Sequence, residues 1–134
     1  MTSTATADSG VIRIPSRYPV ATTADRLESM LKARGILVFA RIDFSGDAAR
    51  AGLSMRPEQL LLFGNPKAGT PLMLAEPVAG LDLPLKALIW EEADGRAWVA
   101  YNDPGYIVRR HMLPSTLVAN LAAVAPIIER AAQE

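Results

Sequence analysis

The sequence predicts an α+β fold with the element order β-α-β(4)-α: an antiparallel five-stranded sheet with two longer helices on one face and short helices in the connections. Five apolar or alternating runs have strand length: residues 11–14, 36–44, 60–64, 85–92 and 97–102. Two stretches have helical periodicity instead, one after Thr22 and one after Ser115. The last four strands follow one another closely along the chain, which favours antiparallel pairing.

The length of 134 residues predicts one domain. We expect that domain to cover residues 10–134, after a disordered N-terminal segment at residues 1–9 that is rich in Thr, Ser and Ala. The run at 36–44 is apolar on both faces over its first half, which is typical of a central strand. Ser45 follows it and is the expected cap of a short helix that Gly52 closes.

The clearest hairpin joins residues 85–92 and 97–102 through Asp94-Gly95, a two-residue turn signal. A turn of that length places Trp90 opposite Val99. The two tryptophans and Tyr101 on this hairpin either form a binding surface or dimer face, or pack as ordinary strand residues.

A constrained segment follows the strand at residues 60–63. Gly64 and Gly69 allow unusual backbone angles, and Thr70-Pro71 has the pattern of a helix cap followed by the first helical residue. The two glycines have P-loop spacing, but the lysine that would reach the phosphates is absent. We therefore exclude nucleotide hydrolysis and expect either a purely structural loop or a small anionic ligand over the helix amides, with Lys67 adding charge.

Four blocks of sequence together resemble the domain of unknown function 302 family. They are FGNPKAGTPLM at residues 63–73, LDLPLK at 81–86, YNDP at 101–104, and His111. The resemblance covers about residues 11–113 and implies the same β-α-β(4)-α order, a homodimer and no assigned activity. Members of the family often have histidine where this chain has Phe44, so a site that needs that histidine is not expected here.

Composition excludes several classes of protein. Fourteen basic and 14 acidic side chains give zero net charge, so we expect no nucleic-acid partner. There is no cysteine, and no apolar run reaches the roughly 18 residues that span a bilayer. The first ten residues lack the features of a signal peptide, so we expect a cytoplasmic protein with no membrane partner. An apolar content of 50% agrees with a homodimer.

Polar residues at the ends of strands and the starts of helices are the candidate site residues. Asn65, Lys67, Thr70, Asn102 and Asp103 are the candidates for ligand binding. Asn65 and Asp103 also fit a turn residue and a helix cap, respectively.

Asp43 and His111 are the candidates for an acid–base pair or part of a metal site. His111 also fits a residue that caps helix carbonyls. No cofactor or metal motif is present, so we expect neither group. A non-catalytic, homodimeric ligand-binding or interaction module is the leading interpretation, and a small enzyme that uses Asp43 and His111 is the alternative.

Overall fold

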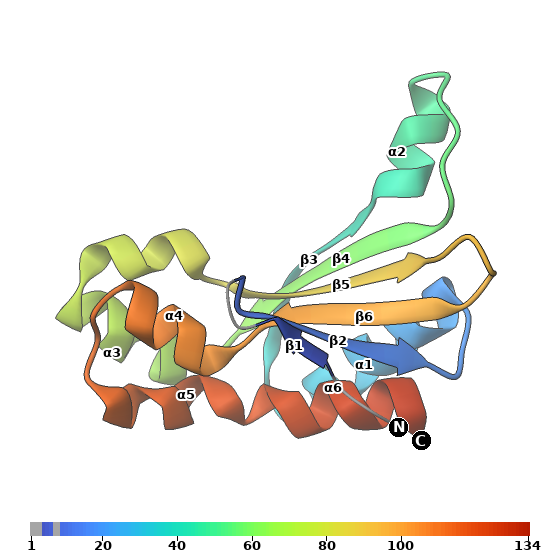
Figure 1. Ribbon diagram of the computed structural model, residues 1–134. Helices are drawn as coiled ribbons and strands as arrows, with labels where there is room; N and C mark the ends of the chain where they lie inside the picture. The colour runs from blue at the N-terminus through green and yellow to red at the C-terminus, as the bar shows by residue number, and fades with distance from the viewer. Residues whose placement is uncertain (1–3, 7–8) are drawn as a thin grey trace.

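The computed structural model describes residues 4–6 and 9–134, and its elements form two layers. Figure 1 shows a sheet with the long helices α1 (Val20–Ala33) and α6 (Val124–Gln133) side by side under one face. Shorter helices gather at one end of the sheet, and α2 (Phe44–Arg50) projects from the other end. The α+β class and the order β-α-β(4)-α are confirmed.

The sheet has six antiparallel strands in the order β1-β2-β6-β5-β4-β3. Their bounds are β1 Thr4–Thr6, β2 Val11–Ser16, β3 Leu37–Asp43, β4 Glu58–Gly64, β5 Leu85–Glu91 and β6 Ala97–Asn102. The sixth strand, β1, pairs with the outer edge of β2, within the segment expected to be disordered. Residues 1–3 and 7–8 of that segment lie outside the described residues.

Short helices fill the connections, as predicted. They are α3 Pro66–Ala75, the 3₁₀ helix η1 Pro77–Asp82, α4 Pro104–Arg110, the 3₁₀ helix η2 Ser115–Leu117 and α5 Val118–Ala122. The last helical stretch is divided between α5 and α6 at Ala123, three residues before Pro126, because a proline disturbs the turn that precedes it. Among the described residues, no helix has both the length and the apolar character needed to cross a bilayer.

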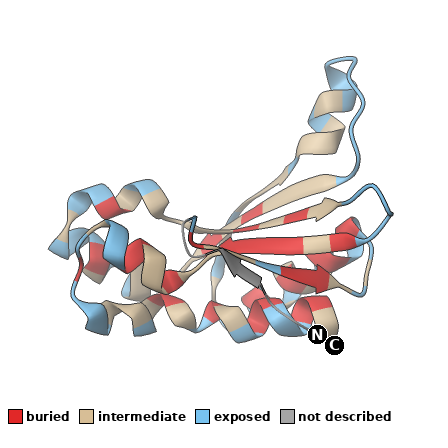
Figure 2. Cartoon of the chain, viewed as in Figure 1, coloured by how far each residue is buried: buried red, intermediate tan, exposed pale blue. Residues whose placement is uncertain are grey.

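The main core lies between the sheet and the two long helices. Ile14, Leu61, Phe63, Ile89 and Val99 of the sheet are at most 1% exposed and pack with residues of α1 and α6. Figure 2 shows these buried positions along the middle strands and the inner sides of the helices. A second, smaller cluster joins α3, η1, α4 and α5 at the end of the sheet. Helices therefore cover one face, and the side chains that alternate with the core residues lie on the other, open face.

The expectation of a central position for residues 36–44 is wrong, because β3 is an edge strand. Leu37 and Phe39 of this strand are 50% and 54% exposed. An apolar strand usually has covered faces. Here the apolar residues lie on an edge strand and are partly exposed. The apolar pattern of a sequence alone does not distinguish such a strand from a central one.

The hairpin exists, but its register differs by one residue from the prediction. Trp90 pairs with Trp98 instead of Val99. The amide of Glu92 donates to the carbonyl of Arg96 at 2.8 Å, which closes a three-residue loop that ends at Gly95. Three-residue hairpins with a left-handed last residue are a common alternative to two-residue turns. The extra loop residue shifts every pair in the ladder.

Candidate functional site

Helix α3 begins five residues earlier than predicted, at Pro66 with Asn65 as its cap. Asn65 Oδ1 accepts a hydrogen bond from the Lys67 amide at 3.0 Å. The amides of Ala68 and Gly69 donate to the carbonyl of Asn65, both at 2.9 Å, and Pro66 has no amide hydrogen. Every amide of the first turn is therefore either absent or already bonded within the chain.

The prediction that Thr70 caps this helix is wrong, because Thr70 lies inside α3 and is exposed. Both Asn65-Pro66 and Thr70-Pro71 have the cap-plus-proline pattern, and the earlier pair is the one used. A helix interior normally disfavours Pro71. Burial of Leu72, which is 0% exposed in the second core cluster, offsets that cost by packing the helix onto the molecule.

A cavity of about 370 Å³ lies beside the first turns of α3, and we call it the α3 pocket. Its apolar walls come from β3, α3, the η1–β5 connection and the α5–α6 junction. They are Ile36, Phe39, Pro66, Ala68, Met73, Leu83, Pro84, Leu85, Leu121, Ala123 and Val124. This volume and composition match small-molecule sites.

Three polar side chains line the α3 pocket: Asn65, Thr70 and Asn120. Asn120 Nδ2 donates to the carbonyl of Ala68 at 3.1 Å, which fixes its amide at the wall and leaves its oxygen without a partner in the described part of the chain. Among the described residues, no Asp, Glu, Lys or Arg side chain lines the pocket. The site therefore suits a neutral, mostly apolar molecule that carries a hydrogen-bonding group.

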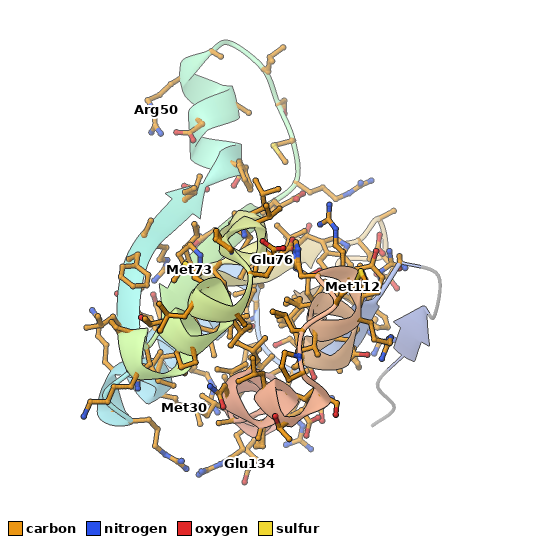
Figure 3. All side chains as sticks on the ribbon, turned by 90° about the vertical axis from the view of Figure 1, so that its left-hand side faces the viewer. Met30, Arg50, Met73, Glu76, Met112 and Glu134 are labelled. Carbon is orange, nitrogen blue, oxygen red and sulfur yellow. The ribbon has the colours of Figure 1, made fainter. Side chains whose placement is uncertain are left out.

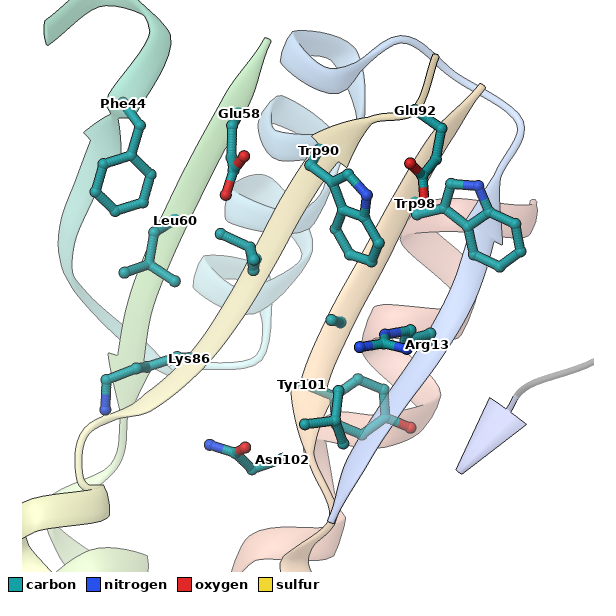
Figure 4. Close-up of a pocket in the computed structure, with 13 residues that line it drawn as sticks. Arg13, Phe44, Glu58, Leu60, Lys86, Trp90, Glu92, Trp98, Tyr101 and Asn102 are labelled. Carbon is teal, nitrogen blue, oxygen red and sulfur yellow. The ribbon is translucent and has the colours of Figure 1, made fainter. Parts of the chain in front are cut away.

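The open face of the sheet forms a second, shallower hollow of about 1060 Å³. Figure 4 shows Trp90 and Trp98 side by side on neighbouring strands, with Glu58 and Glu92 at the same end and Lys86 and Asn102 at the other. The side chain of Tyr101 belongs instead to the core under the sheet, where burial raises the pKa of its hydroxyl. The two tryptophans thus share the open surface, whereas Tyr101, which also borders the hollow, is only 6% exposed.

Asp43 and His111 do not come together. Asp43 is the cap of α2, where Oδ1 accepts hydrogen bonds from Ser45 Oγ at 2.8 Å and from the Gly46 amide at 3.1 Å. These two bonds hold the pKa of Asp43 below its usual value. The predicted cap, Ser45, therefore does not cap α2 but donates a hydrogen bond to the residue that does, Asp43. Figure 1 shows α2 and α4 at opposite ends of the molecule.

The acid–base partner of His111 is Asp82, a residue that sequence reasoning did not select. His111 Nε2 lies 2.5 Å from Asp82 Oδ2, and Arg110 Nη1 donates to both carboxylate oxygens of Asp82 at 3.1 Å. The side chains of His111 and Asp82 are only 6% and 17% exposed. A His–Asp pair can transfer protons. Neither residue lines either of these two hollows, and the cluster joins η1 to α4.

The remaining candidates are distributed over different surfaces. Asn65 and Thr70 line the α3 pocket, and Asn102 lines the open face. Lys67 is exposed outside both hollows, and Asp103 caps α4 by accepting from the Gly105 amide at 3.1 Å. Within residues 4–6 and 9–134, no three His, Asp or Glu side chains are grouped as metal ligands would be.

Comparison with known proteins defines the family. The model described as "Domain of unknown function DUF302" matches residues 12–134, and the chain belongs to this family. A crystal structure of an uncharacterized conserved DUF302 protein from Bacillus stearothermophilus has the same fold. Its TM-score is 0.75 at 20% identity, and the match covers 92% of this chain and 95% of that one.

Three curated proteins of Brucella are similar in sequence. "Fluoride-specific ion channel FluC 1" of Brucella suis biovar 1 (strain 1330) is 43% identical over 106 residues, which is 79% of this chain and 42% of that protein. The FluC 1 protein of Brucella abortus and the FluC 2 protein of Brucella melitensis have the same identity, with 39% of their length covered. The chain thus spans about two-fifths of these relatives.

Proposed function

We propose that this protein is a non-catalytic, homodimeric binding module that holds a small neutral ligand in the α3 pocket. The pocket itself is the observation that supports the proposal, because it combines an apolar body with three polar side chains at its wall. Aromatic amides and alcohols have the matching chemistry: a flat apolar body and one group that bonds to Asn65, Thr70 or Asn120.

Gly69 offers a direct test of this ligand site. A Cβ built on Gly69 has ordinary contact with Leu83 Cδ1 at 3.7 Å, so Gly69→Leu extends a side chain into the pocket without displacing backbone. Ala75→Leu is the control, because Ala75 is exposed on the same helix and lies outside the pocket. A panel of neutral aromatic amides and alcohols is titrated against the three proteins by ligand-observed NMR. We expect Gly69→Leu alone to lose binding; equal binding by all three proteins would exclude the α3 pocket as the site.

The homodimer is the second part of the proposal, and we place it in the cytoplasm because the chain contains no cysteine for extracellular disulfides. Several large apolar side chains are exposed, among them Phe39, Leu53 and Leu74. Such surface is typical of proteins that associate. Light scattering coupled to size exclusion at micromolar concentration measures the mass directly, and a single peak of 14.4 kDa would contradict the dimer.

A small anion is the second candidate ligand, with fluoride as the first to test. The similarity to curated fluoride-specific channels favours it, and Lys67 is an exposed cation at the start of α3. Against it, the first-turn amides are already bonded. Fluorine-19 NMR of fluoride with wild type and Lys67→Ala tests this candidate. Line broadening that Lys67→Ala abolishes would support it, and equal broadening by both proteins would exclude a site at Lys67.

The alternative of an enzyme built on Asp43 and His111 has no support from their positions. Each side chain has its own partners, Ser45 and Gly46 for Asp43 and Asp82 for His111, in different parts of the molecule. General acid–base catalysis needs both groups within hydrogen-bonding reach of one substrate.

A further inference from the structure

The open face of the sheet carries charged side chains that have no partner among the residues that the structure describes. Arg13 on β2 and Glu58 on β4 both line the hollow, with Glu92 beyond the end of β5. The charged groups of these three side chains make no hydrogen bond or ion pair with other described residues. Charges of both signs are therefore available to a partner beside Trp90 and Trp98.

The strand pairing fixes where these charges lie. One row of paired residues crosses the sheet at the level of Arg13. From β2 to β4 it consists of Arg13, Ala100, Leu88 and Leu60. Glu58 lies two residues from Leu60 on β4, in the row that contains Trp90 and Trp98. Arg13 and Glu58 are therefore placed on the two strands that flank the central pair β5–β6, at equal lateral distance from it.

We propose that a second copy of this chain packs on the open face, related by a two-fold axis that runs along the strands between β5 and β6. This operation lays β2 over β4 of the partner subunit. Arg13 then faces the partner subunit's Glu58 across an offset of about 7 Å along the strand, the length of two residues. The same contact occurs twice, because a two-fold interface is isologous.

Charge decides between the two ways in which the faces can meet. A two-fold axis perpendicular to the strands lays β2 over the partner's β2, so Arg13 faces the strand that carries its own copy and lies away from Glu58. The axis along the strands brings Arg13 opposite the partner subunit's Glu58 instead. It also stacks the row of Trp90 and Trp98 on the same row of the partner, where the rings fill the roughly 10 Å between two packed sheets.

Helix α2 and the segment that follows it supply a second contact. Figure 1 shows this arm rising on the side of the sheet away from α1 and α6, and Figure 3 shows Arg50 at its outer end. None of its helical residues is buried, and Leu53 and Met55 just beyond the helix are 68% and 43% exposed. An ordered arm that buries so little within its own chain is positioned to cover the edge of the second copy.

Complementary charge variants test this face, and the test rests on the homodimer proposed above. Arg13→Glu places two like pairs in the proposed interface, and so does Glu58→Arg. Each variant alone should raise the dimer dissociation constant by about tenfold or more, measured by analytical ultracentrifugation. An equimolar mixture of the two variants contains only opposite pairs in its heterodimer. Native mass spectrometry should therefore show the heterodimer in excess over both homodimers.

The possible outcomes distinguish an error in the proposed interface from an error in the proposed homodimer. A wild type that is monomeric at all concentrations would overturn both the homodimer and this interface. A wild-type dimer whose dissociation constant neither variant changes would overturn the interface alone. A statistical mixture of homodimers and heterodimers would overturn the pairing of Arg13 with Glu58. Circular dichroism of each variant confirms folding, and Arg34→Glu, on an exposed residue after α1, is the control that should leave the dissociation constant unchanged.

Discussion

Gly95 ends the loop between β5 and β6 with a backbone φ of +84°. A Cβ added there meets nothing within 4 Å, so substitution is governed by the backbone alone. We expect Gly95→Ala to lower the free energy of unfolding by roughly 1–2 kcal/mol, because other residues resist the left-handed conformation. Gly95→Asn should cost less, since asparagine tolerates that conformation. Urea denaturation of both variants measures the difference, and equal losses would mean that the loop conformation is not the cause.

The carboxylate of Glu28 makes stability depend on pH, because two cationic side chains, Lys32 and Arg41, lower its pKa. Its carboxylate accepts hydrogen bonds from Lys32 Nζ at 2.8 Å and from Arg41 Nη1 at 3.2 Å, and these bonds lower its pKa. A lowered pKa in the folded state means that the unfolded state binds more protons, so Glu28 contributes stability at neutral pH. That contribution is lost as the pH falls below about 4 and through the folded-state pKa.

We therefore expect Glu28→Gln to be less stable than wild type at pH 7 by less than about 1 kcal/mol, the usual limit for a partly exposed pair. The difference should shrink toward zero in acid. Glu129→Gln is the control, because Glu129 is exposed and makes no ion pair with other described residues. Stability curves from pH 3 to 8 provide the measurement. A constant difference between wild type and Glu28→Gln across that range would contradict the role of the charge.

At the scale of elements, the start of α3 depends on Asn65. Asn65→Ala removes the oxygen that accepts from the Lys67 amide, and we expect it to cost about 0.5–2 kcal/mol of stability. Thr70→Ala should be neutral or slightly stabilising, because Thr70 is an exposed residue inside the helix and alanine is the better helix former. Thermal denaturation of the two variants compares them. A larger loss of stability for Thr70→Ala than for Asn65→Ala would show that Thr70 is the cap.

Asp82 and His111 hold η1 and α4 together. Their 2.5 Å contact joins two short elements whose other contacts are to the smaller core cluster. A double-mutant cycle with Asp82→Ala and His111→Ala should give a coupling energy of roughly 0.5–3 kcal/mol, as residues in direct contact do. Arg110→Ala tests the exposed side of the cluster and should cost less, since the Arg110 side chain is half exposed. Additive losses for Asp82 and His111 would show that they act independently.

At the scale of the whole molecule, the proposed interface gives the two faces of the sheet different roles. Ile89 is 0% exposed under the helices, and its neighbour Leu88 lies on the open face. Ile89→Ala should lower the free energy of unfolding by about 2–5 kcal/mol. Leu88→Ala should act mainly on association and make the thermal midpoint less dependent on protein concentration. Calorimetry over a hundredfold range of protein concentration distinguishes the two variants. The same concentration dependence of the thermal midpoint in both would contradict different roles for the two faces.

Local sequence patterns determined the elements of this protein and their order. Alternating and apolar runs specify the strands, because side chains alternate between faces in any sheet. The cap of α4 was also readable, since Asp103-Pro104 carries its own signal and a carboxylate oxygen satisfies the Gly105 amide. This cap joins residues a few positions apart, so a local pattern can predict it, although the same pattern at Thr70-Pro71 lies inside a helix.

Tertiary structure decided what depends on residues far apart in the chain. It placed β3 at the edge of the sheet and paired His111 with Asp82 instead of Asp43. It also built the α3 pocket, where Phe39 and Asn120 from distant segments meet. No local pattern encodes these contacts, because each arises when packing brings together segments that loops and other elements separate.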